Sequence, residues 1–574
     1  MNLKIRFTIL MLTLITVQSK AQRYPKNYFS APLDTPLVLI ATFGEVRPDH
    51  FHSGLDFSTD QHDGKWVRAA ADGYVSRIKI ANDGFGKTLY VTHPNGYVTV
   101  YAHLQSFGNE IQHYVTAAQY EQKSYPIELK PKPNTMKVKK GDVIAFSGST
   151  GDVEGPHLHF EIRDEKTEEP INPLLFGLQV NDTVAPEISY IRVFPVPGQG
   201  IVNTTDTAAN YLAMKSEGEY IINSLDYIQA YGVVGFGIET TDHQQNSDAS
   251  LGVYSVSLKV DSAEVYDFKM DRFNFDDKRY SNAHMDYLSK ERDNLLIQRC
   301  FRLPGNHLAT LYSDTTKTGY LTFSEEGVHN VEFTVKDYNG NKSIVKFPVL
   351  TYTDLSQMKF QAIPDGALLV TPQKGIAIHK SNIDITVPAG AVYESYQFVS
   401  SESAITKGDI SPVYHVGDRY VPVHDAITVS IKPVNLSDSL KSKATIVSFD
   451  KYGGSVYEGG SWNEKFLSAK VRHFGDFTIA LDTLSPKVVK EYYPADLNSS
   501  RGATVQFRIS DDLSGIKNYT MIVDGKWILA EYNKRERLLI GDISEFMQNK
   551  THDIELTVTD EKGNETKFKD TFYF

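Results

Sequence analysis

Three short motifs near the start of the chain carry residues that could hold a metal ion. They are His52-Ser53-Gly54-Leu55-Asp56, Tyr101-Ala102-His103-Leu104 and His157-Leu158-His159-Phe160-Glu161. A hydrolytic zinc site takes three protein ligands from histidine and carboxylate side chains and leaves a fourth position for water. A thiolate zinc site is excluded, because such sites use cysteines in pairs or more and Cys300 is the only cysteine among the 574 residues.

The spacing inside these motifs lets their polar side chains converge. Residues i and i+2 of a β-strand lie on the same face, so His157 and His159 can both point into one cleft. His52 and Asp56 have a glycine between them, which suits a turn followed by a strand and offers one nitrogen and one oxygen donor. An isolated histidine is more often a surface or core residue than a ligand, but three such motifs in one segment favour a metal site.

The segment that must position the motifs is predicted to be a set of short β-strands. Strand-like runs lie at 66–71, 73–80, 88–93, 97–103, 142–147 and 157–163. Period-two alternation and the turn sequences Asp83-Gly84 and Asn95-Gly96 indicate antiparallel hairpins. No part of 36–178 shows convincing helical length and period. The long polar interval 111–137 is therefore expected to form a loop or lid.

The motifs, taken in this order, resemble the M23 (lysostaphin/LytM-type) zinc metallopeptidases. The shared pattern is His-x-Gly-x-Asp, then Tyr-x-His-Leu, then Gly-x-Ser/Thr-Gly followed by His-x-His-Phe-Glu, and the resemblance extends over about 35–178. It implies an antiparallel β-sheet peptidase fold with one Zn²⁺ per chain, held by His52, Asp56 and His159. It also implies that His103 and His157 are the catalytic histidines.

The resemblance leaves the division of labour between these two histidines open. One would act as the general base on the attacking water, and the other would help to hold the water and the tetrahedral intermediate. The implied substrates are peptide bonds in the stem peptides or cross-bridges of bacterial peptidoglycan.

Two other patterns near the motifs are rejected. His50 lies two residues before His52 and imitates a second His-x-His pair, but the glycine and aspartate spacing belongs to His52. Gly86-Lys87-Thr88 is similar to the end of a phosphate-binding loop. Ala81, however, stands where that loop requires its first glycine, and a strand follows instead of a helix.

An internal repeat organises the rest of the chain. Asp182-Thr183-Val184-Ala185-Pro186 recurs as Asp482-Thr483-Leu484-Ser485-Pro486, and Asp337-x-x-Gly340-Asn341 recurs as Asp560-x-x-Gly563-Asn564. The repeat predicts two β-sandwich modules, which resemble bacterial immunoglobulin-like folds. The first copy has an insertion at about 267–320, which holds Cys300 and the best candidate helix, 283–296. The stretch between the copies resembles a ZU5-type sandwich.

We therefore predict an all-β chain with four folded domains behind a leader. The expected division is a signal peptide at 1–21, an M23-type peptidase domain at 22–178, an immunoglobulin-like sandwich with an insertion at 179–352, a ZU5-like sandwich at 353–479 and a second immunoglobulin-like sandwich at 480–574. The leader is predicted from Lys4 and Arg6, from an apolar run too short to span a bilayer, and from small residues before a cut after Ala21.

The leader, the net charge and the cysteine content restrict where the protein acts and what it binds. The leader predicts export to the periplasm, the cell envelope or the extracellular space, with no transmembrane segment left after its removal. The net charge is −12 and no basic cluster occurs, which argues against nucleic-acid binding. The lone cysteine excludes a disulfide framework. The sandwich modules are expected to be spacers or docking surfaces for peptidoglycan or envelope proteins.

Three hypotheses for the function follow. The leading one is an exported zinc endopeptidase of the cell wall. The second is a catalytically silent M23-like module that binds wall peptides or activates a partner amidase; the presence of all five site residues favours activity instead. The third is a surface adhesin in which the sandwiches carry the function and the peptidase domain is ancillary.

Overall fold

The structure, a computed structural model, describes residues 24–34, 36–222, 227–245, 247–352, 359–406, 408–494, 503–546 and 550–574. Within these ranges most of the regular structure is β-strand, which confirms the expected all-β class. The predicted signal peptide at 1–21 lies outside the described residues. None of the helices in the described ranges is both long and apolar enough to cross a bilayer.

Two antiparallel sheets build the part of the chain that carries the motifs. The larger runs in the order β1-β2-β11-β6-β5-β4-β8, with β12 paired to β11 and β9 to β4, and the smaller in the order β3-β10-β7. Their strands are β1 (Leu39–Ala41), β2 (Leu55–Ser58), β3 (Trp66–Arg68), β4 (Gly73–Ile80), β5 (Lys87–Thr92), β6 (Tyr97–Ala102), β7 (Leu104–Phe107), β8 (Ile127–Leu129), β9 (Lys137–Val138), β10 (Val143–Ser147), β11 (His157–Asp164) and β12 (Pro170–Ile171). Each of the six expected strands is present.

Strand β11 is buried on both faces, and the two faces differ in kind. Leu158, Phe160 and Ile162 belong to the hydrophobic core. The alternate positions carry buried polar side chains, namely His157, His159, Glu161 and Arg163. Because β11 lies between β2 and β6, backbone hydrogen bonds hold it from both sides. The polar row therefore stands on a rigid strand in the middle of the sheet.

The expectation of a loop or lid over 111–137 is wrong for its first half, which is helical. Helix α1 (Asn109–Gln122) occupies that half, and β8 and β9 then join the large sheet by pairing with β4. The buried residues of α1 are Ile111, Val115 and Gln119, a narrow stripe on an otherwise polar helix. A stripe of one residue per turn, one of them polar, produces almost no helical period in the sequence.

The first copy of the repeat is a ten-stranded sheet that closes on itself. Its order is β18-β17-β21-β22-β15-β14-β13-β16-β19, with β20 on β16, and a parallel pairing of β16 with β22 makes the closure. Its strands are β13 (Glu187–Val202), β14 (Ala209–Ser216), β15 (Glu219–Ile222), β16 (Ile228–Thr241), β17 (Ser255–Val260), β18 (Ala263–Lys269), β19 (Ile297–Arg299), β20 (Leu321–Phe323), β21 (Gly327–Lys336) and β22 (Lys342–Thr351).

The helix expected at 283–296 is also wrong as a single element. The chain forms the short helix α2 (Ser281–His284), breaks at the extended residue Met285, and makes one more helical turn at Ser289–Asp293. Asp286 explains the break, because its buried carboxylate pairs with Arg192 and Arg299 at 3.3 and 2.9 Å. These tertiary contacts override the helical preference of the segment. Cys300 is free and buried.

The middle and last modules are each built on two sheets of their own. The middle one has orders β24-β25-β29-β33-β32 and β27-β28-β34-β30-β31 plus the pair β23-β26, and the last has β35-β36-β40-β39 and β38-β37-β41-β42. The strands of the middle module are β23 (Leu368–Val370), β24 (Ile376–His379), β25 (Ile383–Val387), β26 (Tyr396–Phe398), β27 (Ser400–Glu402), β28 (Tyr414–Val416), β29 (Ile427–Ile431), β30 (Ala444–Phe449), β31 (Ser455–Gly459), β32 (Ser461–Asn463), β33 (Phe466–Val471) and β34 (Gly475–Leu481). Those of the last are β35 (Lys487–Tyr492), β36 (Thr504–Ser510), β37 (Ile516–Val523), β38 (Lys526–Trp527), β39 (Ala530–Asn533), β40 (Leu538–Asp542), β41 (Thr551–Asp560) and β42 (Glu565–Tyr573).

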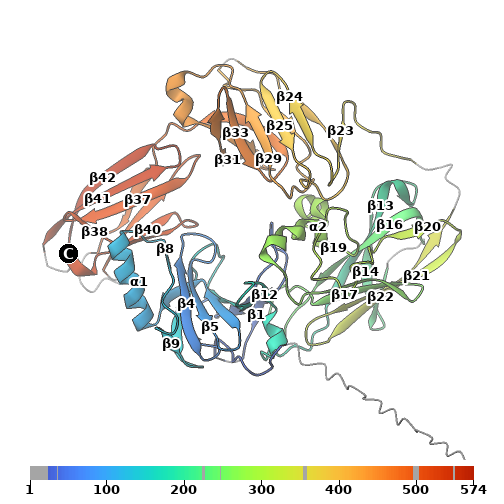
Figure 1. Cartoon of the computed structure of the whole chain (residues 1–574), viewed down its shortest axis with the longest axis horizontal. Coiled ribbons are helices and arrows are strands. Elements are labelled where there is room, and N and C mark those ends of the chain that lie inside the picture. The colour runs from blue at the N-terminus through green and yellow to red at the C-terminus, as the bar shows by residue number, and fades with distance from the viewer. Residues whose placement is uncertain are drawn as a thin grey trace, which may run out of the picture.

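The four bodies are arranged in a ring, in which the last module returns to the first sheet domain beside α1 (Figure 1). The rings of Tyr120 and Trp527 meet edge to face at 5.4 Å, and Lys87 Nζ lies 2.8 Å from Glu531 Oε2. The hydrophobic cores do not follow this division into four bodies. One hydrophobic cluster runs through both the first sheet domain and the first module, whereas the middle and last modules each have a separate core.

Candidate active site

The candidate ligands come from two neighbouring antiparallel strands and the turn before one of them. In the register of β2 against β11, Asp56 lies opposite His159, so their side chains share one face of the sheet. His52 lies in the turn that leads into β2. Its backbone N–H donates to Glu45 O at 2.8 Å, and its carbonyl accepts from Gly44 N at 2.7 Å. The ring of His52 is thereby brought to the same face.

Gly54 explains the glycine in the first motif. A Cβ atom at this position would lie 2.4 Å from Phe160 O and 2.9 Å from His159 Cε1, distances that real Cβ atoms essentially never show. The turn therefore passes directly against β11, and only a residue without a side chain permits that approach.

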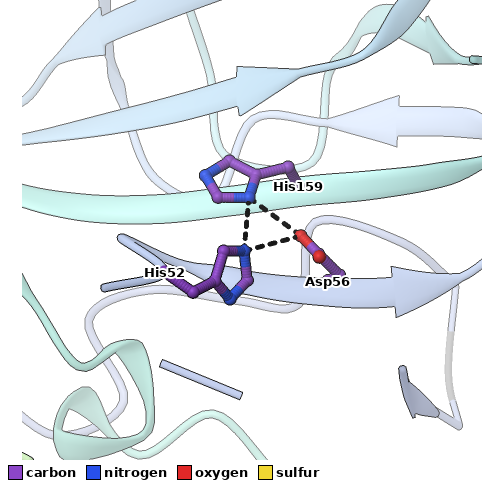
Figure 2. A group of neighbouring side chains, drawn as sticks. All are labelled: His52, Asp56 and His159. Atoms are coloured by element: carbon purple, nitrogen blue, oxygen red, sulfur yellow. Dashed lines mark hydrogen bonds and ion pairs between the residues drawn. The ribbon is translucent and has the colours of Figure 1, made fainter. Parts of the chain in front are cut away.

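Figure 2 shows the three side chains converging on one point. Asp56 Oδ1 lies 3.0 Å from His52 Nε2 and 2.8 Å from His159 Nδ1, and the two ring nitrogens are 2.9 Å apart. All three residues are buried. The structure thus brings together the three residues predicted as metal ligands, which are called the histidine cluster below.

Each imidazole of the histidine cluster is fixed by its other nitrogen. His52 Nδ1–H donates to the carbonyl of Thr42 at 2.7 Å, and His159 Nε2–H donates to Glu161 Oε1 at 3.0 Å. Glu161 in turn accepts from Ser53 Oγ and from Arg163 Nε. Hydrogen bonds of this kind, from a ligand imidazole to a carboxylate or a backbone carbonyl, orient histidines in metal sites.

These bonds test whether the residues present suit a metal ion. With hydrogens only on the outer nitrogens, as a bound cation would require, the rings of His52 and His159 point two lone pairs at each other, and Asp56 adds a carboxylate oxygen. Three electron pairs converging within 3.0 Å repel one another unless a positive charge lies between them. Two imidazole nitrogens and one carboxylate oxygen are a common ligand set of Zn²⁺ in hydrolases, so the residues fit.

The charges around the cluster agree with this interpretation. Burial opposes ionisation of Asp56, but the charge of His52 and the hydrogen bonds from His159 and His52 hold the pKa of Asp56 well below its usual range. Burial also opposes protonation of His159, yet its hydrogen bonds to Asp56 and Glu161 raise its pKa to about 9. The site therefore favours a positive charge at this point.

His103 and His157 lie beside the histidine cluster. Their ring centroids are 4.8 Å apart, and His157 Nε2 is 3.7 Å from Asp56 Oδ1. Each Nδ1–H donates to a backbone carbonyl, that of Thr150 at 3.0 Å for His103 and that of Gly155 at 2.9 Å for His157. Nε2 is therefore left as the basic atom of each ring.

Burial keeps both of these rings neutral. It lowers the pKa of His103 to about 3, with the charges of His157 and His159 acting in the same direction. It also lowers the pKa of His157, although the charge of Asp56 opposes this. A neutral imidazole with a free Nε2 can accept a proton from a neighbouring water, which is what a general base must do.

The backbone at His103 is strained, and a neighbouring turn holds it. The φ of His103 is 58°, in the left-handed region that residues other than glycine rarely adopt. Its N–H donates to Phe85 O at 3.1 Å, and the Phe85 ring lies 4.9 Å from the ring of His159 and 6.0 Å from that of His103. Such strain persists where the surrounding structure over-determines a functional residue.

One further histidine, which the motif spacing excludes as a ligand, lies outside the histidine cluster. His50 is exposed, and its Nδ1 lies 2.9 Å from Asp49 Oδ1.

Two supporting residues, Glu161 and Thr42, were not among the predicted site residues. Glu161 could have been found from the same i+2 rule that pairs His157 with His159. Thr42 contributes only its backbone carbonyl, so its residue type carries no signal.

Two protein-family models match the chain. Residues 50–120 and 127–173 match Peptidase family M23, and residues 368–482 match the Zu5-like domain. The chain therefore contains an M23 peptidase domain followed by a Zu5-like domain, which confirms the resemblances to M23 peptidases and to a ZU5-type sandwich.

Curated relatives match the chain over the same part. The DD-carboxypeptidase/endopeptidase Mpg of Neisseria meningitidis is 35% identical over 127 residues, covering 22% of this chain and 23% of that protein. An uncharacterized metalloprotease of Haemophilus influenzae is 36% identical over 135 residues, 24% of this chain and 22% of that protein. The peptidoglycan DD-endopeptidase ShyC of Vibrio cholerae is 29% identical over 144 residues, 24% of this chain and 27% of that protein. The chain thus spans only about a quarter of the length of these relatives.

Proposed function

We propose that this M23-domain chain is an exported zinc endopeptidase that hydrolyses peptide bonds in the stem peptides or cross-bridges of bacterial peptidoglycan. The domain at 22–178 is the peptidase. The observation that carries the proposal is the convergence of His52, Asp56 and His159 on one buried point beside two neutral histidines. One Zn²⁺ per chain suits this ligand set. Relatives named as a metalloprotease and as a peptidoglycan endopeptidase support the metal and the substrate class.

The two neighbouring histidines supply the proton chemistry. When bound, Zn²⁺ would polarise the scissile carbonyl and make water more acidic. The hydrogen bonds from Nδ1 to backbone carbonyls keep His103 and His157 in the tautomer whose Nε2 accepts a proton. One of the two takes the proton of the attacking water, and the other steadies the water and the tetrahedral intermediate.

The completeness of the site favours catalysis over a silent module that binds wall peptides or activates an amidase. Every one of the five proposed residues is present, and the pair His103 and His157 stands directly beside the histidine cluster. Recognition of the wall must be local, because a net charge of −12 gives no general attraction to an anionic polymer. We assign the three downstream modules to docking on the wall or on envelope proteins.

The proposal is tested by digesting purified peptidoglycan with the mature protein and identifying the released fragments by mass spectrometry. We expect about one zinc per chain and cleavage of peptide bonds. His52→Ala should abolish both. His50→Ala is the matched control, because this neighbouring histidine is exposed and outside the cluster, and it should preserve both.

One result would contradict the proposal, and another would show that the variants do not isolate metal ligation. Stoichiometric zinc without cleavage of several wall types would support the silent module instead. Equal losses in His50→Ala and His52→Ala would mean that the experiment measures folding and not metal ligation. Cleavage of peptide bonds also identifies the bond, because the fragment masses differ for stem peptides and cross-bridges.

A further inference from the structure

Three aspartates meet at the junction between the peptidase domain and the first copy of the repeat. Asp182 lies in the segment before β13, Asp242 directly follows β16, and Asp337 directly follows β21. Each carboxylate offers one oxygen, and these three oxygens all lie within 4.8 Å of one another. This group is called the aspartate cluster below.

Two members of the aspartate cluster are buried and the third, Asp182, is half-buried. Asp242 is 3% exposed and Asp337 4%. Among the described residues no side chain or backbone group donates a hydrogen bond to Oδ1 of Asp242. No ion pair in the part of the chain that the structure describes involves any of the three, and burial together with the charges of Asp337 and Asp182 raises the pKa of Asp242 to about 8. A buried carboxylate oxygen without a donor is unfavourable, and a water or a cation would satisfy it.

A small cavity lies against the cluster. Its volume is about 30 Å³, which exceeds the roughly 10–15 Å³ that one water requires. The three aspartates line it together with Leu39 and Thr42 of the peptidase domain. There is therefore room at the carboxylates for an ion, and the wall opposite belongs to the other domain.

The second copy of the repeat places three aspartates in the same way. Glu187 pairs with Thr241, the residue before Asp242, and Lys487 pairs with Ser510, the residue before Asp511. Asp482 and Asp560 complete this second group, whose carboxylate oxygens also lie within 4.8 Å of one another.

The two groups differ in the hydrogen bonds of one aspartate and in one residue of a turn. Asp511 accepts from Leu513 N and Gly515 N at 3.0 and 2.9 Å, whereas Oδ1 of Asp242 has no donor among the described residues. Lys562, two residues after Asp560, stands where the first copy has Asn339, two residues after Asp337. Burial lowers the pKa of the Lys562 ammonium, while the charges of Asp482 and Asp560 act on it in the opposite direction and so place it near both carboxylates. The second copy therefore has a lysine near its carboxylates, whereas no cationic side chain in the described part of the first copy is paired with its three aspartates.

We propose that the aspartate cluster of the first copy binds one Ca²⁺. All its donors are carboxylate oxygens, a ligand set that suits hard cations, whereas zinc sites usually include histidine or cysteine as well. Ca²⁺ accepts irregular coordination by oxygen ligands, whereas Mg²⁺ demands near-ideal octahedral geometry and usually keeps several waters. Three carboxylates from three separate segments, beside a cavity of about 30 Å³, suit the more adaptable ion.

The site would connect two domains. The loop that follows Asp242 reaches the peptidase domain, where Gln244 Oε1 accepts from Leu39 N at 2.8 Å and Gly252 N donates to Thr42 Oγ1 at 3.0 Å. The carbonyl of Thr42 is the group that orients His52. An ion held by Asp242 would therefore stiffen the support of the histidine cluster.

The test is a calorimetric titration of the full mature protein, freed of metal and reloaded with zinc, with CaCl₂ and in parallel with MgCl₂. We expect one Ca²⁺ with a dissociation constant of about 10⁻⁴–10⁻³ M, as in extracellular calcium modules, together with a rise in the melting temperature and at least tenfold weaker binding of Mg²⁺. Asp242→Asn and Asp182→Asn should each weaken Ca²⁺ binding at least tenfold while zinc content stays at one per chain.

Asp511→Asn is the matched control, since it makes the same change at the equivalent position of the second copy, and it should leave Ca²⁺ binding unchanged. Absence of Ca²⁺ binding at 10 mM, equal affinity for Mg²⁺, or loss of binding in Asp511→Asn with retention in Asp242→Asn would each overturn the proposal. His159→Ala separates this site from the proposed zinc site, because it should lose zinc and keep Ca²⁺.

Discussion

The histidine cluster and the aspartate cluster lie on opposite sides of one domain junction and differ in the way that their ligands are held. The histidine cluster has two imidazoles and one carboxylate, and each imidazole is fixed from behind by a hydrogen bond. The aspartate cluster has three carboxylates, and one oxygen of Asp242 has no hydrogen-bond donor among the described residues. The first arrangement suits tight binding of zinc in one geometry, and the second suits weaker binding of a larger ion with adaptable coordination.

This difference shows that negative charge alone does not determine what a metal site does. Both clusters gather carboxylate in a buried place, yet only one adds neutral bases beside it. His103 and His157 are the groups that would turn a bound ion into a catalyst, and the aspartate cluster has no such neighbours among the residues that line its cavity. We therefore assign chemistry to one cluster and structural support to the other.

Metal removal should give the largest separation between the clusters. Treatment with EDTA should lower peptidoglycan hydrolysis by about 10³-fold or more, because a bound metal supplies several kcal/mol of transition-state stabilisation. One equivalent of Zn²⁺ should restore the rate without Ca²⁺. Restoration by millimolar Ca²⁺ alone would reverse the assignment, and the rate of fragment release measures both cases.

Replacement of either neutral histidine should have the second-largest effect. His103→Asn and His157→Asn should each lower the rate about 10²–10⁴-fold, the usual contribution of a general acid–base group, while zinc content is unchanged. Asparagine is chosen at His103 because it tolerates the positive φ of this residue. Retained zinc distinguishes these residues from His52 and His159. A loss of zinc in both variants would place them among the ligands instead.

Acid should release the metal ions from both clusters. The destabilisation of the fold by acid must therefore be measured separately from the loss of metal. Burial lowers the pKa of His93 to about 4, below the value of about 6.5 in unfolded chains. Between these values only the unfolded state is protonated, so the contribution of His93 is full above pH 6.5 and is lost as the pH falls towards 4. That contribution is at most about 3 kcal/mol at 1.36 kcal/mol per pKa unit.

Urea unfolding of the metal-free protein between pH 7 and pH 4 measures this loss. His93→Gln should flatten the fall in unfolding free energy over this range, because its side chain does not titrate. An unchanged pH slope in the variant would show that other groups cause the acid instability.

The carboxylate behind His159 should have a smaller effect. Glu161→Gln should reduce zinc affinity or activity about 10–100-fold, as is typical when the partner of a ligand imidazole is replaced. Glu165→Gln is the control, because Glu165 follows the same strand and is exposed. Circular dichroism checks the fold, since Glu161 also faces the buried Arg163. Equal zinc affinity in the Glu161 and Glu165 variants would contradict a supporting role for Glu161.

The smallest change should appear in the second copy of the repeat. Lys562→Asn would remove the positive charge and reproduce the residue that the first copy has at Asn339. The number of Ca²⁺ ions bound per chain should then rise from one to two, measured by equilibrium dialysis in millimolar Ca²⁺. A stoichiometry that stays at one would mean that Lys562 is not what distinguishes the copies.

The parts of the molecule that the sequence predicts are those in which neighbours in the chain are also neighbours in space. The strands around the site follow from period-two alternation, and His157 and His159 share a face because they are two residues apart on β11. Gly54 marks the turn that leads into β2, although the contact with Phe160 that requires a glycine there crosses to another strand. Residue type and spacing are sufficient to predict the strands and the shared face of His157 and His159, because these features depend on residues only a few positions apart in the chain.

Features that depend on distant segments could not be predicted in this way. Helix α1 buries only one residue per turn, so its pattern is too weak to distinguish it from a loop. Asp242 reaches Asp182 only because β16 pairs with β13, and no motif marks it. Thr42 acts through its carbonyl. The sequence repeat does reveal four of the six aspartates in the two copies, but the fifth and sixth become visible only through strand register.

The most direct measurement is a metal count on three proteins, the wild type, His159→Ala and Asp242→Asn, after equilibrium dialysis against micromolar Zn²⁺ and millimolar Ca²⁺. The wild type should hold one of each ion. His159→Ala should lose zinc and keep calcium, and Asp242→Asn should lose calcium and keep zinc. Loss of both ions in either variant, or retention of zinc in His159→Ala, would contradict the assignment of one catalytic and one structural metal site.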